Sequence, residues 1–408
     1  LSGCGGGGGG VSGSPPVAAV EEGEVIIGLT DAQGDYLSYV VDVDSLLLEK
    51  ANGSTVETLP LSTRVDFSEL TEVTEFLTVA TVPAGNYTSV VLHLDFSDAE
   101  IVVQDPMGEA VAAQPQDIHG QPIADFAVRL RLTTADVIRV SPGVPAAFSL
   151  DFDLDASNEI EFTDAGAIVS VEPFLLAVPE LEVDRAHRVR GALADVNETG
   201  SEITLKVRPF HHRNGNFGPL TFAVNDATTY EIDGESYTGA GGLSVMAELP
   251  ENTPVVGGIS LADGGRVANT LLAGTSVPWT DGDVVKGVVA AREGDSLTVR
   301  GARVEFADGS HVFRGSFNVL VGEDTAVSAL GVPADSLSAN SISVGQRVLV
   351  FGELQDDLTM DAAQGRVRLV INQLTAEVVQ ASPLAVDLFF LNGRRPAAFD
   401  FSGTGVSQ

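Results

Sequence analysis

Three aspartates recur at every second position of one short segment, and carboxylates with this spacing could bind a calcium ion. Asp151, Asp153 and Asp155 alternate with Phe152 and Leu154. On a β-strand the three would share one face, with roughly 7 Å between successive side chains. Like charges so placed repel one another unless an ion or solvent relieves the repulsion, and carboxylate oxygens are the ligands that Ca²⁺ prefers. The pattern therefore predicts either a calcium site or a solvated acidic strand face.

The same segment is only superficially similar to an EF-hand loop. Ala156 stands where the sharp turn of that loop requires glycine, and Phe162 stands where its bidentate glutamate should be. A second oxygen-rich cluster, Asp31 and Asp35, lies in a turn after the first predicted strand. We therefore expect a protein without a cofactor, and calcium at one of these two clusters is the single candidate.

The residues that would carry catalysis do not form a known constellation in the sequence. There is no Gly-x-Ser-x-Gly, no His-Glu-x-x-His and no Cys-x-x-Cys, which are the patterns of nucleophilic and zinc hydrolases. A glycosidase needs two carboxylates in a cleft with aromatic platforms, but the chain has one tryptophan and five tyrosines. We therefore predict that the protein is not an enzyme, with a polysaccharide-acting hydrolase as a weaker alternative. Its histidines are scattered: His93, His119, His187, His211, His212 and His311.

Cys4 is the only cysteine, and its surroundings suggest that its thiol carries a lipid. The tetrapeptide Leu-Ser-Gly-Cys at residues 1–4 has the form of the cleavage site in bacterial lipoprotein signal peptides. A run of six glycines and a Ser/Pro-rich stretch follow, a composition typical of a flexible tether. We expect residues 1–23 to link a lipidated Cys4 to the folded chain. Because Gly5 rather than aspartate follows the cysteine, the expected location is the bacterial outer membrane, on its periplasmic face or at the cell surface.

The net charge argues against two classes of partner. The chain has 22 Lys and Arg against 57 Asp and Glu, a formal net charge of −35. Residues 1–184 carry −26 of this charge and residues 185–408 carry −9. Such a surface repels nucleic acid and anionic lipid. A glycan or a surface protein remains a possible partner, and the lipid on Cys4 would provide the contact with the membrane.

The composition is that of a mainly β protein, and residues 24–184 form its first predicted unit. Strands are expected over residues 25–30, 36–48, 88–96, 126–132, 137–140 and 148–154, with a turn at Asn52-Gly53. The spacing of Phe67, Leu70 and Leu77 predicts one helix over residues 67–80.

This unit resembles a family of bacterial surface lipoprotein domains, the domain-of-unknown-function 4382 family. The matching segments are Leu-Thr-Asp-Ala at 29–32, Val-Pro-Ala-Gly-Asn-Tyr at 82–87, Leu-Asp-Phe-Asp-Leu at 150–154 and Val-Glu-Pro-Phe at 171–174. The resemblance implies an immunoglobulin- or transthyretin-like β-sandwich with one short helix, on the cell surface. It implies no catalytic residue.

Two copies of a smaller β unit follow, over residues 185–275 and 276–380. Both begin with valine, a basic residue and glycine: Val189-Arg190-Gly191 in the first copy and Val285-Lys286-Gly287 in the second. They are similar to the domain-of-unknown-function 5666 family, which implies two small barrels like the OB fold. The first copy matches less well after Gly239. Residues 381–408 are expected to form a C-terminal hairpin and tail, with strands at 385–391 and 397–401 around Asn392-Gly393.

Together these patterns predict an exported, lipid-anchored bacterial surface protein with a structural or adhesive role. The alternative is a surface or periplasmic binding module for a glycan or a small ligand, because barrel faces can bind without a sequence motif.

Overall fold

The computed structural model describes residues 21–31, 36–71, 73–105, 107, 109–164, 166–172, 175–178, 181–210, 212–262, 265–278, 280, 282–308, 310–332, 336–356 and 358–402. Strands make up 64% of the structure and helical segments 8%, which confirms the mainly β class. Cys4 and Asp35 lie outside the described residues. In the described part of the chain, no helix is long and apolar enough to span a membrane.

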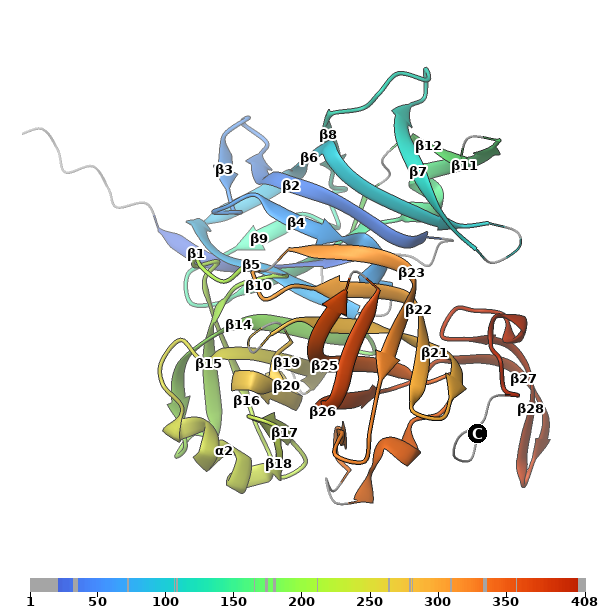
Figure 1. Ribbon diagram of the computed structural model, residues 1–408. Helices are drawn as coiled ribbons and strands as arrows, with labels where there is room; N and C mark the ends of the chain where they lie inside the picture. Colours follow the sequence, from blue (N-terminus) through green and yellow to red (C-terminus); the bar gives the residue numbers. More distant parts are fainter. Residues whose placement is uncertain are drawn as a thin grey trace, which may run out of the picture.

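The first part of the chain folds into a β-sandwich of two facing sheets (Figure 1). One sheet contains, in spatial order, β13 (Leu175–Val178), β10 (Ala146–Phe152), β1 (Glu22–Thr30) and β5 (Val73–Pro83). The other contains β11 (Asn158–Thr163), β12 (Gly166–Val171), β7 (Ala110–Asp117), β6 (Gly85–Gln104), β2 (Tyr36–Lys50) and β3 (Thr55–Glu57). Three further strands pair at its side, β4 (Thr63–Asp66) with β2, and β8 (Asp125–Arg131) and β9 (Ile138–Val140) with β6.

Strand β2 has the alternation expected from its sequence. Val41 and Val43 are fully buried, whereas Asp44 is exposed and Asp42 is half-buried. Successive side chains of a strand point to opposite faces, so the valines pack into the core and the aspartates face outward.

The helix expected over residues 67–80 is wrong. Phe67–Glu69 form a single 3-10 turn, η1, capped by Asp66, whose side chain accepts a hydrogen bond from the Ser68 N–H at 3.1 Å. The chain then enters β5, which lies between β1 and β14 (Ala186–Asn197). A strand buried on both faces loses its alternation of apolar and polar residues, so the apolar spacing here fitted a helix by coincidence.

Two five-stranded barrels follow, and they share one topology. The first closes in the order β14 (Ala186–Asn197), β15 (Glu202–Val207), β16 (Pro219–Ala223), β20 (Gly265–Ala273), β19 (Pro254–Ala262) and back to β14. The second closes in the order β21 (Val284–Glu293), β22 (Ser296–Glu305), β23 (His311–Leu320), β26 (Thr359–Val370), β25 (Arg347–Asp356) and back to β21. In both, the third and fifth barrel strands pair in parallel, which confirms the expected OB-like barrels.

The segments between the third and fourth barrel strands differ. Both begin with a strand parallel to the fifth barrel strand, β17 (Thr229–Ile232) in the first barrel and β24 (Ala326–Ala329) in the second. The first barrel then adds β18 (Glu235–Thr238) and helix α2 (Gly239–Glu248), whereas the second has the 3-10 turn η4 (Ala339–Ser341). Helix α2 begins at Gly239, the residue after which the first copy departs from the repeat. It packs closely on the barrel, since a Cβ at Gly242 would lie 2.1 Å from the ring of Tyr230.

One sheet of the sandwich continues into the first barrel. Val73–Glu75 of β5 pair in parallel with Ala186–Arg188 of β14, giving an 11-stranded sheet and a hydrophobic core common to both units. The second barrel has its own core.

The last hairpin lies earlier in the chain than expected. Strand β28 (Leu384–Leu391) pairs with β27 (Leu374–Ala381), not with residues 397–401, where the 3-10 turn η5 (Pro396–Ala398) is found instead. The Asn392-Gly393 turn does form, with Leu391 and Arg394 hydrogen-bonded across it. The two strands form a sheet of their own, which extends to one side of the second barrel (Figure 1).

Candidate functional site

The three alternating aspartates do not share a strand face. Strand β10 ends at Phe152, and Asp153 is the N-cap of the short helix α1 (Leu154–Ser157), where its side chain accepts the Ala156 N–H at 3.0 Å. Asp155 is exposed in the first turn of that helix. The expected geometry was wrong because aspartate is also a preferred N-cap residue, and here it begins a helix.

Asp31 also has a structural role in this region. It is 1% exposed, and its Oδ1 accepts a hydrogen bond from the Leu154 N–H at 3.1 Å. The side chain therefore connects the end of β1 to the start of α1.

A different set of carboxylates does converge, on the outer face of the sandwich. Single carboxylate oxygens of Asp44 (β2), Asp95 (β6) and Asp125 (β8) lie within 4.8 Å of one another. Asp95 and Asp125 are direct cross-strand neighbours. Local spacing gives no sign of this group, because its members meet only through the register of three strands. These oxygens could contribute to a cation site, although Ca²⁺ takes six to eight ligands.

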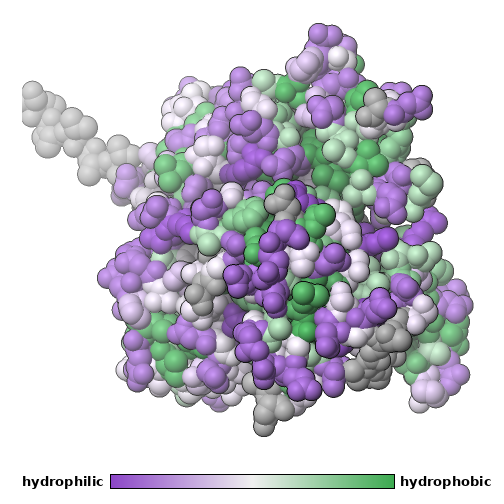
Figure 2. Space-filling view, viewed as in Figure 1, coloured by the Kyte–Doolittle hydropathy of each residue, from purple (hydrophilic) through white to green (hydrophobic). Residues whose placement is uncertain are grey.

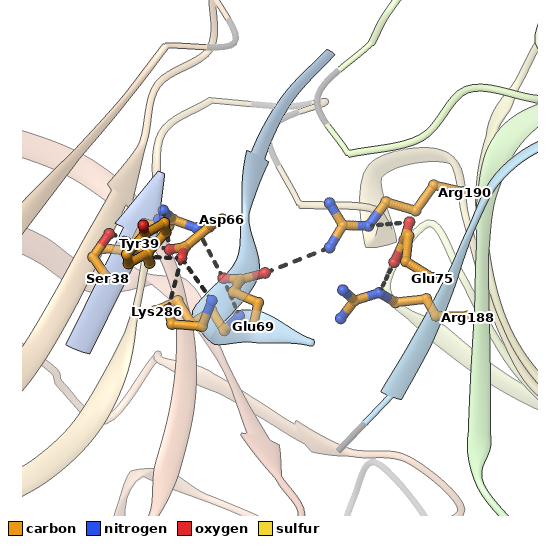
Figure 3. Close-up of polar contacts among 10 residues, drawn as sticks. Ser38, Tyr39, Asp66, Glu69, Glu75, Arg188, Arg190 and Lys286 are labelled. Carbon is orange, nitrogen blue, oxygen red and sulfur yellow. Dashed lines mark hydrogen bonds and ion pairs between the residues drawn. The ribbon is translucent and has the colours of Figure 1, made fainter. Parts of the chain in front are cut away.

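The most unusual feature is a buried group of charges where the sandwich and both barrels meet. We call it the junction network: Asp66, Glu69, Glu75, Arg188, Arg190, Lys286, Arg303 and Glu305 (Figure 3, where the first six are labelled). The three acidic residues from Asp66 to Glu75 belong to the sandwich. The two arginines of β14 belong to the first barrel, and the remaining residues come from β21 and β22 of the second.

Glu69 is the centre of the junction network. Its Oε1 lies 2.6 Å from Lys286 Nζ and 3.1 Å from Arg303 Nη1, and its Oε2 lies 3.7 Å from Arg190 Nη2. One carboxylate of the sandwich thus contacts cations from both barrels. Arg303 also pairs with Asp66, whose Oδ1 accepts the Tyr39 N–H at 2.9 Å and is thereby fixed.

Glu75 forms the second centre. It is 0% exposed, lies on β5, and pairs with Arg188 and with Arg190 Nε at 3.4 Å. Because β5 and β14 are neighbouring strands, these pairs bridge the seam between the sandwich and the first barrel (Figure 3).

The two remaining glutamates differ in their electrostatic environment. Burial alone would raise the pKa of Glu69, but Lys286, Arg303 and the β14 arginines hold it well below its usual value. In contrast, burial and the negative charge of Glu69 raise the pKa of Glu305. The network therefore favours the ionised form of Glu69 and disfavours that of Glu305.

A second buried group of charges joins the two barrels directly. Glu231 of β17 accepts hydrogen bonds from Arg368 Nε at 3.0 Å and Arg368 Nη2 at 2.5 Å, and from Arg366 Nη1 at 3.2 Å. Arg366 also stacks on Phe351, with its Cζ 4.1 Å from the ring centroid. We call these three charged residues the barrel clamp.

A cavity of about 260 Å³ lies beside the junction network, on the first barrel. Its lining includes Arg190, Arg208, Phe210, His212 and Arg213, and we call it the basic pocket. The lining contains three arginines and one histidine, and no carboxylate. Burial lowers the pKa of His212, whose Nε2 lies 3.0 Å from Oγ1 of Thr63 in the sandwich.

The sequence carried a signal for part of this site. Arg190 and Lys286 occupy the same position of the Val-basic-Gly repeat, and both bind Glu69. The glycine after each allows a neighbouring strand to approach, since a Cβ would lie 2.4 Å from Lys206 O at Gly191 and 2.5 Å from Val299 Cγ1 at Gly287. The sequence does not indicate Glu69 as the partner of Arg190 and Lys286, because the apolar spacing of its segment predicts a helix.

Comparison with known proteins identifies only the first unit. Residues 22–169 match the model of the family described as Domain of unknown function (DUF4382), which confirms the first of the two expected resemblances. No curated protein and no solved structure matches the chain. The family is described as a domain of unknown function, so the match assigns no activity to this chain.

Proposed function

We propose that this chain is an exported, lipid-anchored bacterial surface protein with a structural or adhesive role and no catalytic activity. The Leu-Ser-Gly-Cys motif at residues 1–4 and the glycine run after it support lipidation at Cys4. We further propose that the two barrels are repeats of the domain-of-unknown-function 5666 family. Their common strand order and their Val-basic-Gly starts support this assignment.

The hairpin β27–β28 is the observation that carries the adhesive role. It exposes apolar side chains, among them Leu384 (71%), Val378 (62%) and Phe389 (51%). Figure 2 shows apolar surface at this side of the molecule. Neither strand contains lysine or proline, the residues that usually protect a free sheet edge, and a two-stranded sheet is marginally stable in water. Such a hairpin can accept a further strand at its edge.

The charges of the hairpin indicate the chemistry of its partner. Glu377 and Asp387 lie directly opposite each other, and the hairpin contains no basic residue. Like charges directly opposite are destabilising, and a cation between them would relieve the repulsion. The favoured partner is therefore an extended protein segment with apolar side chains and a central lysine or arginine.

Binding of a designed peptide to the full chain tests this role. A peptide of alternating valine and threonine with a central lysine is compared with the same peptide carrying glutamate, by fluorescence anisotropy. We expect the lysine peptide to bind, and the double variant V378S/F389S to weaken its binding by about tenfold or more. Equal binding of both peptides, or unchanged binding by the double variant, would contradict the adhesive role.

Metabolic labelling with a fatty-acid analogue tests the anchor independently. The unaltered protein should take up label, and Cys4→Ser should not. Equal labelling of the two would show that Cys4 is not the lipidated residue.

The basic pocket favours a second candidate function, a binding module for a small ligand or glycan. Pockets with apolar walls and a few converging polar groups are typical ligand sites. In this role the hairpin and the pocket would act separately.

A further inference from the structure

The basic pocket has the size of a single small molecule. Its volume of about 260 Å³ lies just below the range of roughly 300–1,000 Å³ that is usual for drug-sized ligands. Its walls come from β14, β19 and the connection between β15 and β16, so the barrel holds them in place.

One cation of the pocket has its charge available for a ligand. Arg190 is paired with Glu69 and Glu75 of the junction network. Arg208 differs: its Nε and Nη1 donate to the carbonyl oxygens of Gly215 (3.2 Å) and Arg213 (2.8 Å). These bonds fix the plane of the guanidinium without neutralising it. No carboxylate among the described residues forms an ion pair with Arg208.

Part of the pocket wall is apolar, beside the polar His212, Arg213, Asn252 and Thr280. Phe210 is 4% exposed, and Val255 and Val277 are almost fully buried. Such walls suit a ring or a short carbon chain and offer little to a hydrated inorganic ion. A planar guanidinium matches the two oxygens of a carboxylate.

We infer that the basic pocket binds a small organic carboxylate, whose anionic group contacts Arg208 and whose carbon skeleton packs on Phe210 and Val255. The inference depends on the binding-module candidate and not on the adhesive role. In a protein of net charge −35, a pocket whose lining holds the Arg208 guanidinium and no carboxylate is a local exception that attracts anions.

Calorimetric titration of the full chain at about 0.15 M salt tests the inference. Glucuronate and benzoate are the carboxylate probes, because each joins a carboxylate to a ring; of the comparisons, glucose lacks the carboxylate, acetate lacks the ring, and inorganic phosphate is an anion without a carbon skeleton. We expect at least one carboxylate probe to bind, about tenfold or more tightly than any comparison. Absence of binding by both probes up to about 10 mM, or tighter binding of glucose, acetate or phosphate, would overturn it.

Substitutions of charged residues test whether the carboxylate binds in the basic pocket. Arg208→Gln should weaken binding of the carboxylate by about tenfold or more. Arg213→Glu, at an exposed position, adds a negative charge at the rim and should weaken it similarly even if Arg208→Gln fails to fold. Arg139→Gln removes the same charge from an exposed position of β9 and should change affinity less than twofold, about 0.4 kcal/mol.

Unchanged carboxylate affinity in both Arg208→Gln and Arg213→Glu would overturn the assignment of the ligand to the basic pocket. Neither substitution should change peptide binding at the hairpin β27–β28. The pocket proposal and the adhesive role can therefore fail separately.

Discussion

At the scale of single residues, the junction network contains two glutamates whose pKa values are shifted in opposite directions. Glu69 is surrounded by cations, which hold its pKa well below the usual value. Glu305 lies in the same network, yet burial and the charge of Glu69 raise its pKa. The same substitution at these two positions should therefore have different consequences.

Glu69→Gln should destabilise the protein by about 3 kcal/mol, because it removes the carboxylate that the partly exposed Lys286 and the buried Arg303 have in common and, among the described ion pairs, leaves Arg303 with Asp66 alone. The free energy of unfolding at pH 7 in guanidinium chloride measures this. Glu49→Gln is the matched control, since it breaks a pair in which Arg129 is 49% exposed, and it should cost at most about 1 kcal/mol. Equal losses in both variants would contradict the special role of Glu69.

Glu305→Gln should change the free energy of unfolding by no more than about 1 kcal/mol at pH 7. Because the pKa of Glu305 is raised in the fold, its negative charge is less favourable there than in the unfolded chain, and an uncharged amide removes no net favourable charge interaction. The same denaturation experiment gives the answer. A loss as large as that of Glu69→Gln would show that Glu305 is an essential counter-ion.

The free energy of unfolding in acidic solution should depend on Glu69. Its folded pKa lies well below the ordinary glutamate value of 4.5, so its contribution to stability is present above that pH and is lost as the pH falls through the folded pKa. The stability difference between the unaltered protein and Glu69→Gln should therefore be constant from pH 7 to about pH 5 and shrink only in more acidic solution. Unfolding curves across this range would show it, and a difference that already shrinks near neutral pH would contradict the lowered pKa.

The residue-level prediction from sequence succeeded where a pattern was local. The Val-basic-Gly repeat marked Arg190 and Lys286 as equivalent positions. The acidic triad of Asp44, Asp95 and Asp125 could not be seen, because strand register alone brings these residues together.

At the scale of elements, the seam between the sandwich and the first barrel depends on a close backbone approach. The Val79 N–H donates to Phe217 O at 2.6 Å. The next residue, Gly218, has a φ of +98°, and a Cβ there would lie 1.8 Å from Val79 O. Only glycine fits this position.

Gly218→Ala should destabilise the protein by about 3 kcal/mol or more, from the left-handed backbone and from displacement of β5. Gly53→Ala is the matched control: it has a similar φ of +81° but nothing within 4 Å, so it should cost only about 1–2 kcal/mol. Thermal melting followed by circular dichroism compares them. Equal shifts of the midpoint would mean that the seam tolerates a Cβ.

The elements that sequence predicted correctly are those with one exposed face. The alternation in β2 and the repeated starts of the barrels were sufficient to assign strands. The apolar spacing of β5 predicts a helix because this strand is buried on both faces and lacks the alternation of a half-exposed strand. The spacing around Asp153 predicts a strand because its role as a helix cap depends on where β10 ends.

At the scale of the whole molecule, the three units form one body rather than separate modules on linkers. The sandwich and the first barrel have a common sheet and core. The second barrel joins them through Lys286 and Arg303 at the junction network and through the barrel clamp at Glu231. A body of this kind would hold the basic pocket in a fixed position beside the junction network.

Differential scanning calorimetry of the unaltered chain and of the double variant E69Q/E231Q tests this central claim most directly. The unaltered chain should give one endotherm, because its units unfold together. The double variant should give two, with the second barrel melting apart from the sandwich and first barrel, since it removes the pairs at Glu69 and Glu231 and leaves only the Arg303–Asp66 pair and the exposed Arg300–Glu109 pair among the described ion pairs to that barrel. Two endotherms in the unaltered chain, or a single shifted endotherm in the double variant, would contradict the claim that the charges of Glu69 and Glu231 join the second barrel to the other two units.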